Sequence, residues 1–164
     1  MRIGVIADTH DNLPMLERAL TVLKRRGVEM LLHAGDYVAP FSLKAILASE
    51  LPMVGVFGNN DGERAGLSRL SESLHKGPYR FELDGRTIIM AHEPAVLDGA
   101  LRPGDELAVC AHTHEVQISE GPPLRVNPGE VGGWLTGRCT GAVVELKSLT
   151  AEVVEFGTQG RGRR

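Results

Sequence analysis

Aspartate, asparagine and histidine residues recur along this chain, each time directly after a short apolar run. The first cluster is Asp8-Thr9-His10 and the last is Ala111-His112-Thr113-His114. Carboxylate oxygens and imidazole nitrogens are common ligands of divalent transition metals. If strand pairing continues through His112 and His114, their spacing places both rings on one face of a sheet. The two clusters therefore predict metal chemistry.

Three further clusters follow apolar runs between these two, and they are Gly35-Asp36, Gly58-Asn59-Asn60-Asp61 and Ala91-His92. Each polar residue has an ordinary explanation when taken singly, such as a helix cap for Asp8 or Asp36, a turn residue for Asn59 or a strand end for His92. Together, two carboxylates, one amide and four imidazoles at one end of the sheets would lack partners without a metal. The joint pattern favours a metal site over a metal-free α/β protein with chance motifs.

The elements that must position these residues alternate in the first half of the chain. Apolar runs predict strands, and a 3.6-residue apolar period after Asn12, a candidate N-cap, predicts a helix that Gly27 ends. The strands are expected at residues 2–7, 28–32 and 52–57, and the helices at residues 13–23 and 40–49. Residues 63–78 are polar and are expected to be helical or irregular. In open α/β sheets, loops at the carboxyl ends of strands are the usual place for a ligand.

The second half is mostly β. Asp84-Gly85 between residues 79–83 and 86–90 predicts a hairpin with a type I′ turn. Further strands are expected at residues 107–111, 115–119, 123–126, 140–147 and 150–156, with Asn127-Pro128-Gly129 as a turn. Two sheets packed face to face with helices outside would bury both halves.

Composition predicts one domain over residues 1–156 and a disordered basic, glycine-rich tail over residues 157–164. A net charge of −3 and an aromatic content of 4% argue against a dedicated nucleic-acid surface. No apolar stretch is long enough for a membrane span and no signal peptide is evident, so we expect a cytoplasmic protein. Cys110 and Cys139 are expected to be packed thiols.

Two histidines stand apart from the clusters. His33 precedes Asp36 within a strand and is expected to be packed or to support the ligands from behind. His75 lies in the polar segment and is expected to be exposed.

The five clusters, in this order, resemble the motifs of the calcineurin-like metallophosphoesterases. The short length and the turn at residues 127–129 resemble the small bacterial and archaeal phosphodiesterase branch of that family. The resemblance extends from Arg2 to about Phe156. It implies an α/β fold of four layers, αββα, in which outer helices cover two mixed sheets.

The resemblance also implies a binuclear metal centre. Asp8, His10 and His114 would bind one ion, Asn59, His92 and His112 the other, and Asp36 would bridge both. Oxygen and nitrogen ligands without thiolate suit Mn, Fe, Zn, Co or Ni, and we favour Mn²⁺.

Phosphodiester hydrolysis by a hydroxide that bridges two divalent ions is the function that this centre implies. Four positive metal charges less those of Asp8, Asp36 and the hydroxide leave one positive charge to attract a phosphate. Metals about 3.5–4 Å apart can hold the attacking and leaving oxygens in line. The expected partner is a phosphodiester substrate, nucleotide-derived diesters included. The sequence leaves open a homo-oligomer and, as an alternative function, a metal-binding scaffold of the same fold that docks a protein partner.

Catalytic roles are expected for His10, Asn60 and Asp61. Asn60 departs from the family pattern, in which most active relatives carry histidine and the small-phosphodiesterase branch often carries cysteine. Asn60 can donate a hydrogen bond to a phosphoryl oxygen but cannot act as an acid at neutral pH. Glu93 stands where relatives usually have glycine, and a carboxylate there would repel an anionic substrate or narrow the cleft unless it turns away.

Overall fold

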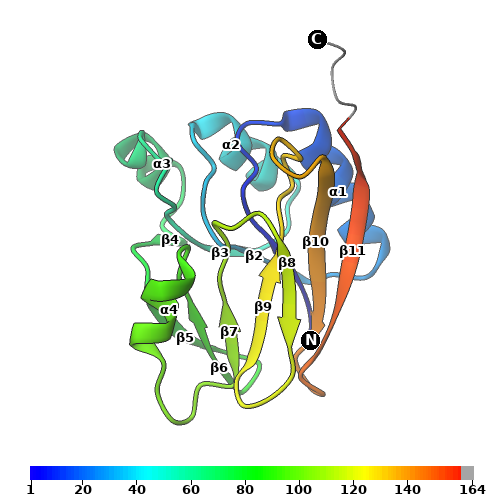
Figure 1. The fold of residues 1–164 in the computed structure, drawn as a ribbon. Helices are drawn as coiled ribbons and strands as arrows, with labels where there is room; N and C mark the ends of the chain where they lie inside the picture. The colour runs from blue at the N-terminus through cyan, green and yellow to red at the C-terminus, as the bar shows by residue number, and fades with distance from the viewer. Residues whose placement is uncertain (160–164) are drawn as a thin grey trace.

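The alternating side chains of strand β1 (Arg2–Ile6) show how the chain builds its layers. Ile3 and Val5 pack toward a second sheet, while Ile6 packs toward helices on the opposite face. A strand that is apolar on both faces must be covered on both, because successive side chains point in opposite directions. The computed structural model, which describes residues 1–159, accordingly has two sheets face to face between outer helices (Figure 1).

The first sheet contains six strands in the described part of the chain. Its spatial order is β11 (Thr150–Thr158), β10 (Arg138–Glu145), β1, β2 (Met30–His33), β3 (Met53–Val56) and β4 (Leu74–His75). Strands β1 to β4 are parallel, whereas β10 is antiparallel to both of its neighbours. The carboxyl ends of β1, β2 and β3 therefore lie at the same edge.

The second sheet has five strands within residues 1–159. Its order is β5 (Tyr79–Leu83), β6 (Arg86–Met90), β7 (Leu107–Val109), β9 (Leu124–Pro128) and β8 (Val116–Ser119). Strands β6, β7 and β9 are parallel, and β5 and β8 are antiparallel edge strands. Both sheets are thus mixed, as expected.

Four helices cover the outer faces in the described region. They are α1 (Leu13–Arg25), α2 (Pro40–Ala48), α3 (Arg64–Leu70) and α4 (Pro94–Ala100). Leu16, Leu43 and Leu67 of the first three helices share one apolar cluster on the first sheet, and Leu97 of α4 packs on the second sheet. The expected four-layer αββα architecture is confirmed.

Several local expectations need correction. Helix α4 was not anticipated, because its seven residues are too few to show a helical period. Strand β7 ends at Val109, two residues before the expected end, and β9 includes Asn127 and Pro128, which were expected to be a turn. His75 is not exposed but half-buried, since it stacks on Tyr79 with ring centroids 3.7 Å apart.

The predictions for the start of α1 and for the C-terminal end of the domain have different outcomes. Asn12 caps α1 by accepting a hydrogen bond from the Met15 N–H, as predicted. Strand β11 continues through Thr158, past the expected domain end at Phe156, while the remainder of the expected tail, residues 160–164, lies outside the described residues. None of the helices within the described residues combines the length and apolar composition needed to cross a membrane.

Candidate metal centre

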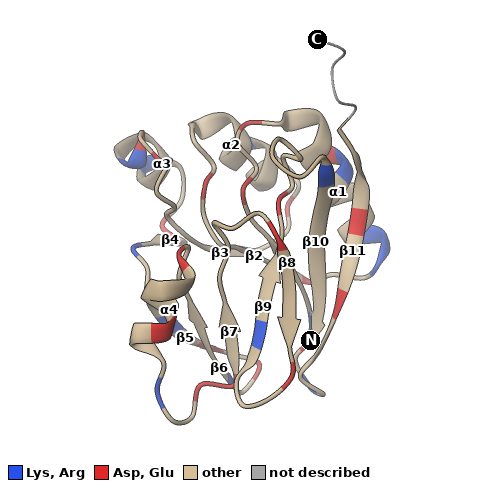
Figure 2. Ribbon diagram, in the orientation of Figure 1, with Lys and Arg blue, Asp and Glu red and all other residues tan. Residues whose placement is uncertain are grey.

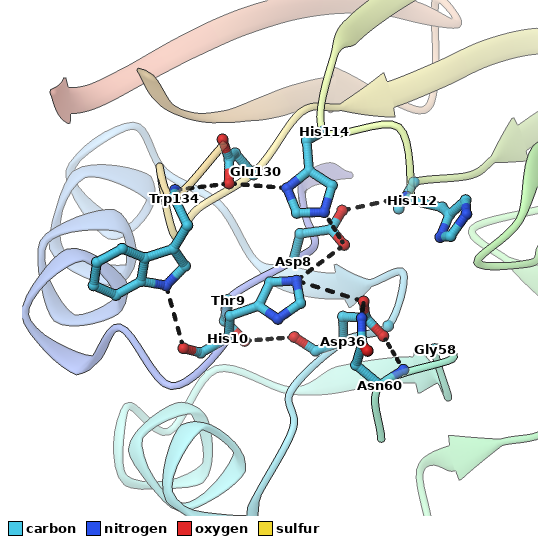
Figure 3. A network of polar contacts seen from close by, with 12 residues as sticks. Asp8, Thr9, His10, Asp36, Gly58, Asn60, His112, His114, Glu130 and Trp134 are labelled. Atoms are coloured by element: carbon cyan, nitrogen blue, oxygen red, sulfur yellow. Dashed lines mark hydrogen bonds and ion pairs between the residues drawn. The ribbon is translucent and has the colours of Figure 1, made fainter. Parts of the chain in front are cut away.

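The loops that follow five strands converge at one edge of the two sheets, and Figure 3 shows residues of the loops after β1, β2, β3 and β7. They come from β1, β2 and β3 of the first sheet and from β6 and β7 of the second. All seven expected metal ligands form one continuous series of contacts there. In order along that series, the links are His114 Nε2–Asp8 Oδ1 3.5 Å, Asp8 Oδ1–His10 Nε2 3.7 Å, His10 Nε2–Asp36 Oδ2 3.5 Å, Asp36 Oδ2–His92 Nε2 3.4 Å, His92 Nε2–Asn59 Oδ1 2.9 Å and Asn59 Oδ1–His112 Nδ1 2.9 Å.

Five of these seven residues have a left-handed backbone. The φ angles are 50° at Asp8, 41° at His10, 61° at Asp36, 71° at His112 and 60° at His114. Residues other than glycine rarely adopt positive φ, and such strain concentrates at functional sites. The sequence argument that a continuing strand aligns His112 and His114 is therefore wrong. A loop turns them instead, which leaves His112 exposed and His114 buried.

Asp36 lies at the middle of the series and is tightly enclosed. The backbone N–H of Asn60 donates to Oδ1 at 2.9 Å, and the Asn60 side-chain amide donates to Oδ2 at 2.8 Å. Although burial raises the pKa of this carboxyl, hydrogen bonds from His92 and Asn60 outweigh it and hold the pKa well below its ordinary value. Asp36 is thus ionised at neutral pH and lies at the centre of the site.

Two neighbours fix the Asp36 loop. A Cβ on Gly58 would lie 2.1 Å from Asp36 Oδ1, so only glycine allows this approach. Asp61, one of the expected catalytic residues, is buried and accepts hydrogen bonds from the backbone N–H groups of Gly58 at 2.7 Å, Val38 at 2.8 Å and Asp36 at 3.2 Å. Its carboxylate therefore faces the backbone of the loop.

The hydrogen bonds behind two imidazoles set their tautomers. His92 Nδ1 lies 2.9 Å from the Ala34 carbonyl, and His114 Nδ1 lies 2.9 Å from Glu130 Oε2. Both partners only accept, so Nδ1 of each ring carries a proton and Nε2 of each ring faces the site. The two Nε2 atoms face the oxygens of Asp36, Asn59 and Asp8. Imidazole nitrogens converge here with carboxylate and amide oxygens, and this set of ligand atoms fits a divalent metal.

Unpartnered atoms give the same indication. Within residues 1–159, Asp8 Oδ1 and His10 Nε2 are buried atoms without a hydrogen-bond partner. Buried polar atoms are nearly always satisfied by protein, water or an ion. The surrounding carboxylates also raise the pKa of His10, chiefly through its contact with Asp8, and that of His92, where Asp36 outweighs the effect of burial. The site therefore attracts positive charge.

A supporting residue that the sequence argument missed is Glu130. It is fully buried, and besides His114 it accepts hydrogen bonds from the backbone N–H groups of Trp134, Leu135 and Thr136. Burial raises its pKa, but the donors from Thr136 and His114 outweigh this and keep the pKa below its ordinary value. The available signal was its place after the expected strand at residues 123–126, from which the expected turn Asn127-Pro128-Gly129 separates it.

His33 behaves as expected from the sequence. It is fully buried behind the site, its Nδ1 accepts from the Gly35 N–H at 3.2 Å, and its ring stacks on Tyr37. Burial lowers its pKa to about 3, so the ring is neutral. The sequence also gave no reason to single out Thr9 as a supporting residue. Its hydroxyl donates to the Asp36 carbonyl at 3.2 Å, which links the buried residues behind the site to the ligands.

A cavity of about 330 Å³ opens beside Asn59 and His92. Its other walls carry Arg64, Lys76 and Glu93, all of which are exposed. The Arg64 guanidinium lies 5.5 Å from the centre of the Phe57 ring and donates to the Gly58 carbonyl at 2.8 Å. Glu93 thus lines the cavity, where its carboxylate can narrow the cleft as expected. The positively charged side chains of Arg64 and Lys76 line the same cavity.

Comparison with known proteins finds phosphoesterases both by sequence and by structure. Residues 1–149 match the model of the calcineurin-like phosphoesterase superfamily domain. Phosphodiesterase MJ0936 of Methanocaldococcus jannaschii is 31% identical over 156 residues, which cover 90% of this chain and 94% of the relative. The structure of an archaeal phosphodiesterase superimposes with a TM-score of 0.85 at 29% identity, covering 94% of this chain and 99% of that one.

More distant structures share the fold. The phosphoesterase Yfce of E. coli has a TM-score of 0.67 at 20% identity, with 96% of this chain and 100% of that chain covered. Vps29 of Chaetomium thermophilum has a TM-score of 0.69 at 16% identity, with 94% of both chains covered. The family match spans most of the chain and includes every strand-end loop that contributes to the site, and the chain belongs to the calcineurin-like phosphoesterase superfamily.

Proposed function

We propose that this protein is a phosphodiesterase that works with two divalent metal ions, Mn²⁺ being the favoured metal. The observation that carries the proposal is the position of Asp36 Oδ2, which lies 3.5 Å from His10 Nε2 and 3.4 Å from His92 Nε2. One carboxylate oxygen thus stands between two groups of ligands. The name of the archaeal relative, a phosphodiesterase, supports the choice of reaction.

The ligands divide into two groups about Asp36. Asp8, His10 and His114 would hold the first ion, and the short distances among their ligand atoms support this grouping. Asn59, His92 and His112 would hold the second ion, since Asn59 Oδ1 lies 2.9 Å from a nitrogen of each ring. Below, these groups are called the first and second metal sites. Two bound ions would activate water and neutralise charge on the phosphoryl group.

The chain's own groups would then hold and orient the substrate. We assign Asn60 to the orientation of Asp36 and of a phosphoryl oxygen, because its exposed amide has two donors and one of them already contacts Asp36. His10 keeps its Nε2 toward the site and would bind the first ion through it, so this nitrogen is not available for proton transfer while the ion is bound. We assign Asp61 a positioning role, since its oxygens accept from three backbone N–H groups around Asp36.

The cavity beside the second metal site would receive one ester group of the diester. Arg64 and Lys76 would counter the phosphate charge, while Glu93 opposes a substrate that carries further negative charge at this point. Phe57 provides an apolar surface on the same wall. These features favour a diester with one small or aromatic group, such as a nucleoside.

An activity panel on the metal-free and reloaded protein tests the proposal. The protein is stripped with a chelator, reloaded with Mn²⁺, and assayed with an aryl diester, the matching aryl monoester and a cyclic nucleotide. We expect diester turnover that requires metal and exceeds monoester turnover. Two bound ions without turnover of any ester would instead support the metal-binding scaffold that docks a protein partner.

A further inference from the structure

We infer that residues 130–136, called here the 130–136 loop, hold the first metal site and have no part in the second, with Glu130 as the positioning residue. The inference rests on the proposed function, because it concerns how one of the two proposed metal sites is built. It begins from the hydrogen bond between Glu130 Oε2 and His114 Nδ1 at 2.9 Å. A carboxylate behind a metal-binding imidazole fixes its tautomer and orientation and raises its basicity.

The loop contacts every member of the first site. Its Gly132 N–H donates to the Asp8 carbonyl at 3.0 Å, and the Trp134 indole N–H donates to the His10 carbonyl at 3.4 Å. With the Glu130–His114 contact, the loop thus reaches all three ligands of the first site, as Figure 3 shows for Glu130 and Trp134. Gly132 also accepts from the Asn12 side chain at 2.7 Å, which ties the loop to the start of α1.

The second site is supported from elsewhere in the described structure. His92 is held by the Ala34 carbonyl at 2.9 Å, and Asp36 by Asn60. The loop that carries His112 is held by Asn127, whose amide donates to the Ala111 carbonyl at 3.2 Å and to the Thr113 hydroxyl at 3.0 Å. Within residues 1–159, no hydrogen bond or ion pair joins the 130–136 loop to Asn59, His92 or His112.

The loop itself is built around the Glu130 carboxylate. Glu130 is fully buried, and its oxygens accept from three consecutive backbone N–H groups and from the Thr136 hydroxyl at 2.8 Å. A Cβ on Gly132 would lie 2.8 Å from Trp134 Cδ1 and 3.0 Å from the Asp8 carbonyl oxygen, so the close approach to Asp8 requires glycine. An amide at position 130 would turn one acceptor into a donor that faces donors.

The test measures Mn²⁺ affinity at each site separately. His112→Ala removes a ligand of the second site, and His114→Ala removes one of the first, so each background retains one intact site. In the His112→Ala background, Glu130→Gln should weaken Mn²⁺ binding about 10–100-fold by titration calorimetry. In the His114→Ala background, Glu130→Gln should leave the Mn²⁺ affinity unchanged. Glu120→Gln, at an exposed turn, is the matched control and should change neither affinity.

A spectroscopic signature separates positioning from a general loss of structure. At Mn²⁺ concentrations that fill both sites of the wild type, its spectrum should show a spin-coupled pair, and that of Glu130→Gln the six-line signal of an isolated ion. Equal weakening in both backgrounds, or in neither, would overturn the inference. If Glu130→Gln does not fold, Thr136→Val, which removes one donor to Glu130, goes through the same comparison with a smaller loss expected only at the first site. A wild type that binds no divalent metal would instead refute the proposed function.

Discussion

At the scale of single residues, the centre depends most on Asp36, whose Oδ2 lies within 3.5 Å of imidazoles from both groups of ligands. Asp36→Asn keeps the shape of the side chain but removes the charge that both ions would share. We expect the metal content of the purified variant to fall well below two ions per chain and diester turnover to fall at least as much. Metal analysis by mass spectrometry provides the measurement. Full occupancy together with wild-type turnover would rule out a bridging role.

A second residue-scale prediction concerns the choice between diesters and monoesters. Asn60 is exposed beside Asp36 and cannot donate a proton to an alkoxide leaving group at neutral pH. We therefore expect a preference for diesters, steepest for aryl leaving groups. A general acid typically contributes about 10²–10⁴-fold, so Asn60→His should raise monoester turnover relative to diester turnover.

Both substrates are to be assayed at saturating Mn²⁺ for wild type and variant. A ratio that does not move toward monoesters would mean that position 60 does not control the leaving group. The acid would then have to be sought outside the seven ligands, because His10 Nε2 faces the first metal site and would bind the ion.

Whether a site residue could be predicted from the sequence depended on its position relative to a strand end. The seven candidate ligands each follow a strand, and a strand end is visible in the sequence as an apolar run that stops at a polar residue. Glu130 also follows an expected strand, but three expected turn residues separate it from that strand, and only the folded chain brings its carboxylate 2.9 Å from His114. Asp61 could be singled out because it belongs to the Gly58-Asn59-Asn60-Asp61 cluster. The sequence could not reveal that its oxygens accept from backbone N–H groups.

At the scale of elements, the loops determine the ligand geometry more than the strands do. The sequence predicted which strand ends meet, because parallel strands place their carboxyl ends at one edge. It could not predict that β7 stops at Val109 and that His112 and His114 have φ angles of 71° and 60°. Left-handed backbone at a non-glycine residue is imposed by the surrounding contacts and leaves no local pattern.

Gly58→Ala tests the close approach of the β3 loop to Asp36. A methyl group there would lie 2.1 Å from Asp36 Oδ1 and would force the loop apart. We expect a loss of about 1–3 kcal/mol in the free energy of unfolding, measured by urea denaturation, together with weaker Mn²⁺ binding. Gly62→Ala is the control, because a Cβ at that position meets nothing within 4 Å. Equal behaviour of the two variants would contradict the packing argument.

At the scale of the whole molecule, an ion pair that stabilises the fold lies apart from the residues of the metal centre. Arg80 of β5 pairs with Asp105, just before β7, through Nε–Oδ1 at 2.6 Å and Nη2–Oδ2 at 2.9 Å. This pair lies at the amino end of β7, opposite the metal centre. Figure 2 shows the other lysine, arginine, aspartate and glutamate residues distributed along helices, strands and loops throughout the fold.

The Arg80–Asp105 pair gives a pH prediction. Arg80 holds the pKa of Asp105 below its ordinary value of 3.8. A lowered folded pKa stabilises the protein above the ordinary value, and this contribution is lost as the pH falls through the folded pKa. Asp105→Asn should therefore cost about 1–3 kcal/mol of unfolding free energy at pH 7, and the difference from wild type should shrink below about pH 4. A difference that is constant from pH 7 to pH 2.5 would contradict the ion pair's role.

The architecture itself was accessible from the sequence, because the alternation of strands and helices and the order of the polar clusters are both properties of the whole chain. The positions of two metal ions are not. The most direct test is anomalous diffraction from crystals soaked in Mn²⁺. We predict two peaks about 3.5–4 Å apart, one near His10 and His114 and the other near His92 and His112, with Asp36 in contact with both. A single peak, or two peaks without Asp36 between them, would contradict a shared binuclear centre.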